Sequence, residues 1–272
     1  MSFWQSVLAF LDTSMETPPA FGWFHLMWLA ISFLALIPLL RFPKQQSEDH
    51  VRRVVLTTAI VVIVLEIYKQ INYSFSYTDG IIFDYQWYAF PFQFCSTPMY
   101  IGLLAGLTKK GKLHDSLCAY LATYAVFAGA AVMIYPNDAL VDTLGINIQT
   151  MICHGSMITI GIYLYATGHV KLNHKTVLKA MPVFAVTVSM AAVMNEIAYR
   201  VGLLETETFN MFYISPYCDP HLLIYKDVQA VVPFPWSLVI YILGFTAAAY
   251  IILLLAMGIG AVIRKIRRPI PV

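Results

Sequence analysis

RRVVLTTAIVVIVLEIYK, residues 52–69, begins with two arginines, continues through twelve uncharged residues and then reaches Glu66. An apolar run of this kind, continued to residue 72, is long enough to cross a ~30 Å hydrocarbon core as a helix. Basic residues at one end of such a helix mark its cytoplasmic side. The stretch therefore predicts a membrane-spanning helix that carries an ionisable group near its far end.

Apolar stretches of similar length recur along the chain. Charged residues make up only 12% of the 272 residues, against about 25% in a typical soluble domain, so lipid must solvate much of the protein. We expect an all-α integral membrane protein, a single domain over residues 1–272 with seven transmembrane helices. The expected helices cover residues 21–40, 54–72, 92–108, 114–135, 147–167, 177–201 and 234–262.

The basic residues indicate the orientation of these helices. Fourteen of the seventeen lysines and arginines fall in four alternate segments between or after them. By the positive-inside rule these segments are cytoplasmic, which predicts an N-out/C-in, multi-pass protein of the cell (plasma) membrane. An even number of spans would divide the basic segments between the two sides. The fourteen residues are Arg41, Lys44, Arg52, Arg53, Lys109, Lys110, Lys112, Lys171, Lys175, Lys179, Arg264, Lys265, Arg267 and Arg268.

The predicted outer segments carry aromatic and turn-forming residues. Residues 73–88 alternate polar and aromatic side chains around Asp79-Gly80, a preferred type I′ turn, and predict a small outer β-hairpin. Residues 204–233 are rich in proline and aromatic residues. We expect them to fold over the helix ends as a lid, the alternative being an interfacial loop with no role. Residues 1–20 lack the basic region of a cleaved signal and predict a short interfacial helix.

Two parts of the sequence resemble each other. His25 precedes Glu66 by 41 residues, and His154 precedes Glu196 by 42 residues. Each glutamate is followed within four residues by a tyrosine and a basic residue. This spacing predicts a parallel 3+1+3 repeat, in which the first three and last three helices share an orientation and the fourth joins them.

Ionisable and polar residues lie at similar depths in the predicted helices. At 1.5 Å per residue, His25, Glu66, Cys95, His154 and Glu196 all fall within roughly 5–12 Å of the outer boundary. This arrangement predicts an outward-facing polar cavity. Alternatively, Glu66 and Glu196 each pair with a basic residue on their own helix and only hold the bundle together. The expected supporting polar layer consists of His25, Glu66, Lys69, Asn195, Glu196, Arg200 and Ser237.

Cys95 is the candidate nucleophile within this layer. Pro98 should bend the helix beside it and open space for a ligand. A histidine such as His154 could take the thiol proton, and Glu66 or Glu196 could orient the imidazole. The alternative is that Cys95 is a small apolar packing residue, as membrane cysteines usually are.

The sequence gives no sign of a metal or cofactor. Its four cysteines, Cys95, Cys118, Cys153 and Cys218, have no CxxC spacing, so we expect no disulfide framework and no structural zinc. A net charge of +2 does not suggest a nucleic-acid partner. The last predicted helix has no lysine at membrane depth for a retinal Schiff base.

Several segments together resemble a known family. They are FGWFHL at 21–26, PFQFCS at 91–96, His154, and the region from Asn210 to PFPW at 233–236. In order and spacing they resemble the YwaF-type family of bacterial integral membrane proteins over nearly the whole chain. That family is similar to a eukaryotic membrane acyltransferase that remodels ether phospholipids and depends on a cysteine and a histidine. The resemblance implies Cys95 as acyl-accepting nucleophile and His154 as general acid/base, although Gln93 stands where bacterial relatives often have a histidine.

Two functions follow as expectations. The first is a lipid acyltransferase or acyl hydrolase that takes membrane lipids as substrates and uses Cys95 and His154. The second is a small-molecule transporter or binding protein of 3+1+3 architecture, since several uniporters are built this way. The oligomeric state cannot be read from the sequence.

Overall fold

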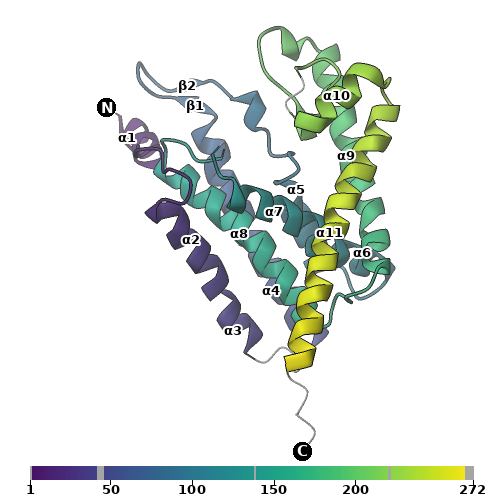
Figure 1. The fold of residues 1–272 in the computed structure, drawn as a ribbon. Helices are drawn as coiled ribbons and strands as arrows, with labels where there is room; N and C mark the ends of the chain where they lie inside the picture. The colour runs from purple at the N-terminus through teal and green to yellow at the C-terminus, as the bar shows by residue number, and fades with distance from the viewer. Residues whose placement is uncertain (1, 42–45, 138, 220–221, 267–272) are drawn as a thin grey trace, which may run out of the picture.

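The computed structural model describes residues 2–41, 46–137, 139–219 and 222–266. Long helices dominate it, with α2 and α3 along one side and α11 along the other (Figure 1). The long and medium helices are α2 (Trp23–Leu34), α4 (Glu48–Asn72), α5 (Thr97–Leu107), α6 (Lys112–Ala122), α7 (Tyr124–Ile134), α8 (Leu144–Ala166), α9 (Lys175–Arg200) and α11 (Trp236–Ile266). The short ones are α1 (Phe3–Leu11), α3 (Leu36–Leu40), α10 (Leu223–Val231) and the 3₁₀ turns η2 (Trp87–Ala89), η3 (Leu203–Glu205) and η4 (Met211–Tyr213).

Five helices in the described residues are long and apolar enough to cross a membrane. They cover Trp23–Leu40, Glu48–Asn72, Lys112–Ile134, Lys175–Arg200 and Trp236–Ile263, so the chain is a multi-pass membrane protein. The other two predicted spans correspond to α5, which has 11 residues, and to α8, which has 23 residues but is less apolar.

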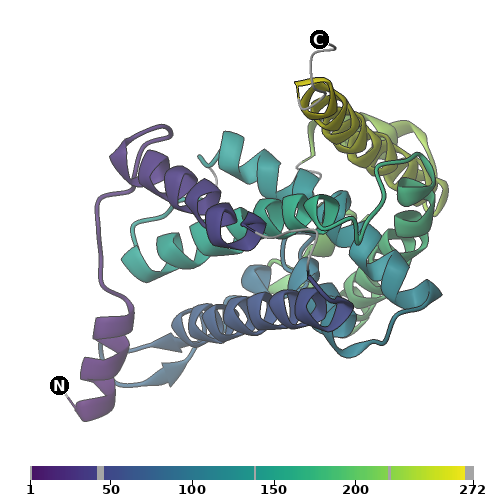
Figure 2. The same ribbon diagram turned by 90° about the horizontal axis from the view of Figure 1, so that it is seen from below.

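The position of α8 explains its composition. Figure 2 shows α8 between α2 and α4, and it also packs against α6 and α7. Its polar side chains Asn147, Gln149, Thr150, His154 and Thr159 are all buried. A helix surrounded by other helices needs fewer apolar residues than one that faces lipid, because its polar groups can find partners inside the protein.

Three predicted helices differ from the observed ones. The predicted span 21–40 divides at Ala35 into α2 and α3, and the predicted span 114–135 divides at Thr123 into α6 and α7. The predicted helix 92–108 begins only at Thr97, which makes Pro98 its second residue rather than a mid-helix kink. Proline has no backbone N–H to donate, and the first turn of a helix is where that loss is harmless.

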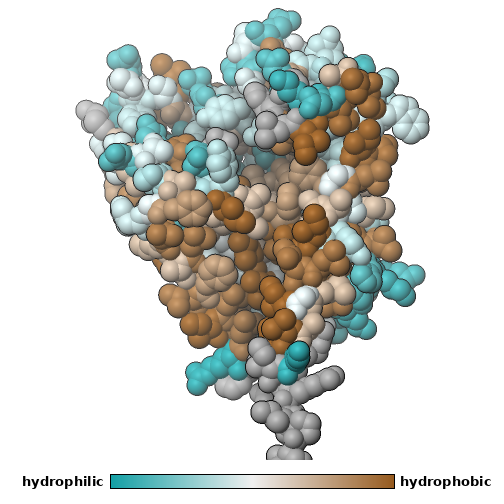
Figure 3. All heavy atoms as spheres, viewed as in Figure 1, coloured by the Kyte–Doolittle hydropathy of each residue, from teal (hydrophilic) through white to brown (hydrophobic). Residues whose placement is uncertain are grey.

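The surface divides into bands along the helix axes. In Figure 3, hydrophobic residues cover the middle of the molecule and hydrophilic residues gather at the two ends. One end, here called the hairpin end, carries α1, the strands and α10 (Figure 1). The opposite, basic end is tied together by ion pairs from Lys110 to Glu48 (3.2 Å) and from Lys179 to Asp115 (3.1 Å). Lys44, Arg267 and Arg268 lie outside the described residues.

The predicted β-hairpin is confirmed. Strands β1 (Phe75–Ser76) and β2 (Ile82–Phe83) pair antiparallel, with Phe75 opposite Phe83 and Ser76 opposite Ile82. This register leaves residues 77–81 as the loop, so the expected two-residue type I′ turn is wrong. Gly80 still adopts a positive φ of 131°, which a side chain at this position would oppose.

The N-terminal helix is present as expected, from Phe3 to Leu11. Its last carbonyl, that of Leu11, accepts hydrogen bonds from Tyr68 Oη (2.6 Å) and from Asn72 Nδ2 (3.2 Å) on α4. Asp12 accepts a further bond from the Tyr77 hydroxyl at 2.9 Å. These contacts attach α1 to α4 and to the hairpin.

Candidate functional site

Cys95 lies in a turn just before the first residue of α5. Ser96 is the N-cap of that helix, so the cysteine stands at the helix end where backbone N–H groups and the helix dipole favour negative charge. The thiol of Cys153, on α8, lies 3.9 Å from the carbonyl oxygen of Cys95. The fold therefore brings Cys95 beside the residue that precedes His154.

His154 is buried, with 7% of its surface exposed, and only one of its ring nitrogens has a partner. Nδ1 lies 2.7 Å from the carbonyl oxygen of Thr150, one turn earlier on α8, and therefore donates a hydrogen bond. Nε2 then carries the lone pair, and this buried atom has no hydrogen-bond partner among the residues that the structure describes. The arrangement leaves a neutral imidazole with its basic nitrogen free, and Cys95 does not hydrogen-bond to it in this conformation.

His25, the other candidate base, has no free nitrogen. The backbone N–H of Phe21 donates to Nδ1 at 3.0 Å, so Nε2 carries the proton and donates to the carbonyl oxygen of Met133, also at 3.0 Å. The side chain is fully buried and connects α2 to the end of α7. His25 is thus a structural residue in this conformation.

Glu66 forms the centre of a buried polar cluster. Its carboxylate lies 2.8 Å from Lys69 Nζ and accepts hydrogen bonds from Gln70 (2.8 Å) and from Gln149 on α8 (3.1 Å). Lys69 is close enough to both Cys95 and His154 to interact with them electrostatically. The cluster therefore places a paired positive charge near the two candidate catalytic residues.

Glu196 and Arg200 lie elsewhere. Their side chains are 37% and 74% exposed, and they pair at 2.6 Å on the outside of α9. The hydroxyl of Tyr217 also donates to Glu196 at 2.6 Å, and this bond raises the pKa of Tyr217. The structure does not bring this pair into the buried cluster around Glu66.

Asn195 and Ser237, the remaining polar candidates, hold backbone and side chains in place. The Asn195 amide donates to the carbonyl oxygen of Met211 (3.0 Å) and accepts from its N–H (2.7 Å). Ser237 accepts a hydrogen bond of 3.3 Å from Tyr225. Both side chains are buried, and both support the segment that follows α9.

Residues 209–215, here called the cover segment, fold inward against Gln93 and Phe94, the two residues that precede Cys95. Gln93 clamps the segment by donating to the carbonyl oxygen of Asn210 (3.0 Å) and accepting from the N–H of Phe212 (2.8 Å). Phe212 is fully buried and packs against Phe94, with ring centroids 5.7 Å apart. It holds a positive φ of 59°, which a bulky residue adopts only when its surroundings enforce it.

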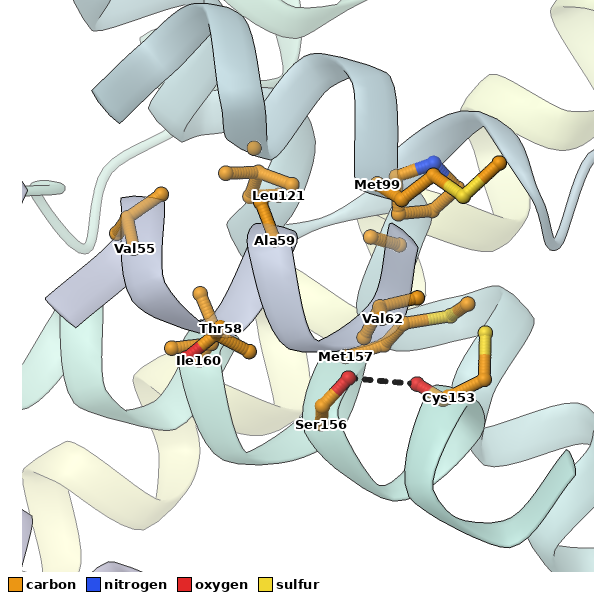
Figure 4. A pocket seen from close by; sticks show the side chains of 13 residues that line it. Val55, Thr58, Ala59, Val62, Met99, Leu121, Cys153, Ser156, Met157 and Ile160 are labelled. Carbon is orange, nitrogen blue, oxygen red and sulfur yellow. Dashed lines mark hydrogen bonds between the residues drawn. The ribbon is translucent and has the colours of Figure 1, made fainter. Parts of the chain in front are cut away.

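A small apolar cavity lies between α4, α5, α6, α7 and α8, and Cys153 and Ser156 are among the residues that line it (Figure 4). Its volume is about 30 Å³, enough for one or two water molecules. A second apolar cavity of about 220 Å³ lies between α2, α3, α4 and α8. Thr58, Ser156 and Ile160 line both, so these three residues separate the small cavity from the larger one.

A family model described as the TMEM164 family matches residues 20–257. The chain belongs to the TMEM164 family. This match covers all five apolar spans almost completely, together with Cys95 and His154, in a family of membrane proteins. No curated protein and no solved structure matches this TMEM164 family member.

This TMEM164 family member contains a further cluster of side chains, which the sequence did not predict. His114, Cys118 and His169 place their side-chain ligand atoms within 4.8 Å of one another near the basic end. The signal was the spacing of His114 and Cys118, four residues apart and therefore on one face of a helix. The third member lies 51 residues further on, so cysteine spacing alone could not reveal it.

Proposed function

We propose that this TMEM164 family member is a membrane-embedded lipid acyltransferase or acyl hydrolase with Cys95 as nucleophile and His154 as general base. The single observation that carries the proposal is the free Nε2 of His154. An unpaired polar group in a protein interior costs about 1–3 kcal/mol, so its persistence suggests a role in binding or catalysis. The resemblance to a cysteine- and histidine-dependent acyltransferase supports the same pair.

The proposed reaction has two halves. His154 Nε2 accepts the Cys95 thiol proton, and the thiolate attacks the ester carbonyl carbon of a donor lipid. The ester C–O bond breaks, the departing alcohol oxygen takes the proton from His154, and a thioester remains on Cys95. A lysolipid hydroxyl or a water molecule then gives its proton to His154, attacks the thioester and releases the thiolate.

The position of Cys95 at a helix end favours this chemistry. The N-terminal end of α5 directs its dipole toward Cys95. This dipole stabilises a thiolate and the oxyanion that forms on the carbonyl. We infer that substrate binding brings Cys95 and His154 into hydrogen-bond contact, because catalytic hydrogen bonds often tighten only in the substrate complex.

The two apolar cavities support an acyl chain as the bound group. The small cavity is lined by Cys153, whose thiol lies 3.9 Å from the carbonyl oxygen of Cys95, and the larger one lies beyond Thr58, Ser156 and Ile160. Rotation of these three side chains would join the cavities into one channel that begins at Cys153. The volume of about 30 Å³ in the small cavity is too small for a chain, so we propose that this channel opens when lipid binds.

The test uses purified full-length protein in nanodiscs with a donor phospholipid that carries an alkyne-tagged acyl chain. We expect a hydroxylamine-sensitive thioester on Cys95, identified by mass spectrometry, and no acyl transfer in Cys95→Ala. Cys218→Ala is the matched control and should transfer at the wild-type rate. Full turnover by Cys95→Ala would refute the covalent mechanism and favour a transporter or binding protein.

We also propose seven transmembrane helices, with α5 and α8 completing the five apolar spans, an N-out/C-in orientation and the plasma membrane as location. A cysteine introduced at Gly80 should react with an impermeant thiol reagent on intact cells, and one at Lys110 should not. The reason is the concentration of basic residues at the basic end. Reversed labelling would overturn the orientation.

A further inference from the structure

Three potential metal ligands meet near the basic end of the molecule, away from Cys95. His114 and Cys118 lie one turn apart on α6, and His169 belongs to the loop between α8 and α9. Nε2 of His114 lies 2.7 Å from Nε2 of His169 and 3.4 Å from the Cys118 thiol. His114 and Cys118 are each 99% buried, whereas His169 is partly accessible.

The hydrogen bond that His114 makes through Nδ1 leaves Nε2 of the same ring unprotonated. Nδ1 lies 3.0 Å from the carbonyl oxygen of Ala105, the last buried turn of α5, and so must donate to it. Nε2 then has a single lone pair, yet both His169 and Cys118 approach it. One lone pair cannot accept two well-formed hydrogen bonds, so hydrogen bonding satisfies only part of this cluster.

We propose that His114, Cys118 and His169 bind a Zn²⁺ ion. Two imidazole nitrogens and a thiolate are ligands that zinc prefers. The hydrogen bond from His114 Nδ1 to a backbone carbonyl is the outer contact that metal-binding histidines usually make, since it orients the ring and directs Nε2 at the ion.

The distances are close to those that zinc requires. Zn–N bonds of about 2.0–2.1 Å in a tetrahedral site place two nitrogens roughly 3.3 Å apart. The two Nε2 atoms at 2.7 Å would therefore separate by roughly 0.6 Å on binding. His169 can supply this movement because it lies in a loop rather than within a helix.

A fourth ligand can reach the site from the surface. His169 lines a cavity of about 500 Å³ at the basic end, together with Asp115, Thr176 and several lysines. A water molecule or a small anion from this cavity can complete the tetrahedron. The lysines repel a cation, so binding must depend on the Cys118 thiolate, and zinc would displace the thiol proton to water.

The proposed ion would have a structural effect that is separate from acyl transfer. It would link α6 to the loop that precedes α9, and α6 and α9 pack against each other in the fold. Zinc would therefore hold α6 to the loop that precedes α9 at the basic end. The catalytic residues proposed above, Cys95 and His154, are not part of this link.

The test measures zinc directly on the purified full-length protein. The protein is dialysed against a chelator, then titrated with ZnSO₄ by calorimetry, and bound metal is counted by mass spectrometry. We expect one ion per chain, and a thiolate-to-cobalt absorption band when Co²⁺ replaces Zn²⁺. Cys118→Ala and His169→Gln should each weaken binding by more than the roughly 10–100-fold that loss of an outer-shell contact produces.

Matched controls are Cys218→Ala and His50→Gln, which should bind one zinc with wild-type affinity. His169→Gln changes a loop residue and keeps the test valid if Cys118→Ala does not fold. Wild-type protein that binds no zinc, or that binds it as well after His169→Gln, would overturn the proposal. Cobalt bound without the thiolate band would overturn it as well.

Discussion

Glu66–Lys69 and Glu196–Arg200 look equivalent in the sequence but occupy opposite environments. Both pairs follow a histidine by about the same distance and end a helix of about the same length. The Glu66 and Lys69 side chains are only 6% and 17% exposed, and Glu66 also accepts hydrogen bonds from Gln70 and Gln149. The second pair lies on the outside of α9. The helix spacing is shared, but the neighbours are not.

The two histidines show the same divergence. His25 has both nitrogens bonded, while His154 keeps Nε2 free. His154 lies on α8, which other helices enclose, and His25 lies on α2 at the periphery of the bundle. The predicted repeat therefore does not imply two sites, because each side chain takes its chemistry from the helices packed around it.

The largest expected difference between His154 and His25 is in the activity of their alanine variants. His154→Ala should lower acyl transfer by roughly 10²–10⁴-fold, the usual contribution of a general base. It should cost less stability than His25→Ala, because only one of the His154 ring nitrogens is hydrogen-bonded among the described residues. His25→Ala should instead lower stability, since it leaves Phe21 N–H and the Met133 carbonyl unpaired at about 1–3 kcal/mol each. Transfer rates in nanodiscs and thermal unfolding distinguish the two effects.

The exposed His50 provides the control for both histidine substitutions, and His50→Ala should change neither quantity. A double variant of Cys95→Ala and His154→Ala should be hardly slower than either single variant, as expected for residues that act together. If His25→Ala were stable but inactive and His154→Ala were active, the general base would be His25 rather than His154, and the comparison would be reversed.

A smaller difference is expected in the stability of the two ion pairs. Glu66→Gln should destabilise the protein by about 3–5 kcal/mol, because it leaves the buried Lys69 without its carboxylate. Adding Lys69→Met should recover most of this loss, since an apolar pair can replace a buried ion pair. Glu196→Gln should leave the unfolding temperature close to that of the wild type, because water already solvates that carboxylate.

Unfolding by urea in detergent micelles would measure these variants side by side. Equal destabilisation by Glu66→Gln and Glu196→Gln would show that the two pairs are equivalent after all, contrary to the environments described above. A single Glu66→Gln that is stable but inactive would instead give Glu66 a direct part in the proposed site.

The smallest expected effect concerns Asn195, which precedes Glu196 where Leu65 precedes Glu66. Asn195→Ala removes both hydrogen bonds to Met211 and should cost about 2–3 kcal/mol. Hydrogen exchange should rise selectively in the cover segment. Ser237→Ala, which removes one 3.3 Å contact, is the comparison variant and should cost about 1 kcal/mol or less.

If Asn195→Ala raised hydrogen exchange equally along the whole chain, the Asn195 side-chain amide would support global folding rather than the cover segment alone. A rise in exchange confined to residues 209–215 would identify the cover segment as a separate unit that has no counterpart beside Glu66.

The sequence by itself determined the membrane class, the approximate place of the apolar helices, the short N-terminal helix and the hairpin. Each depends on local composition or on the spacing of neighbouring residues, and both are properties of a linear chain. Apolar length predicted the five spans, and Asp79-Gly80 predicted the turn region although not its length. Pro98 was recognised as a break, but whether it kinks a helix or begins one depends on what packs before it.

Only the tertiary structure decided which polar residues share an environment. The equivalence of Glu66 and Glu196 could not be tested without knowing that α4 packs against α8 while the end of α9 is exposed. The state of His25 and of His114 depended on the carbonyls of Met133 and Ala105, which sequence spacing does not reveal. The burial and partners of an ionisable group come from distant segments, and these determine both its charge and its chemistry.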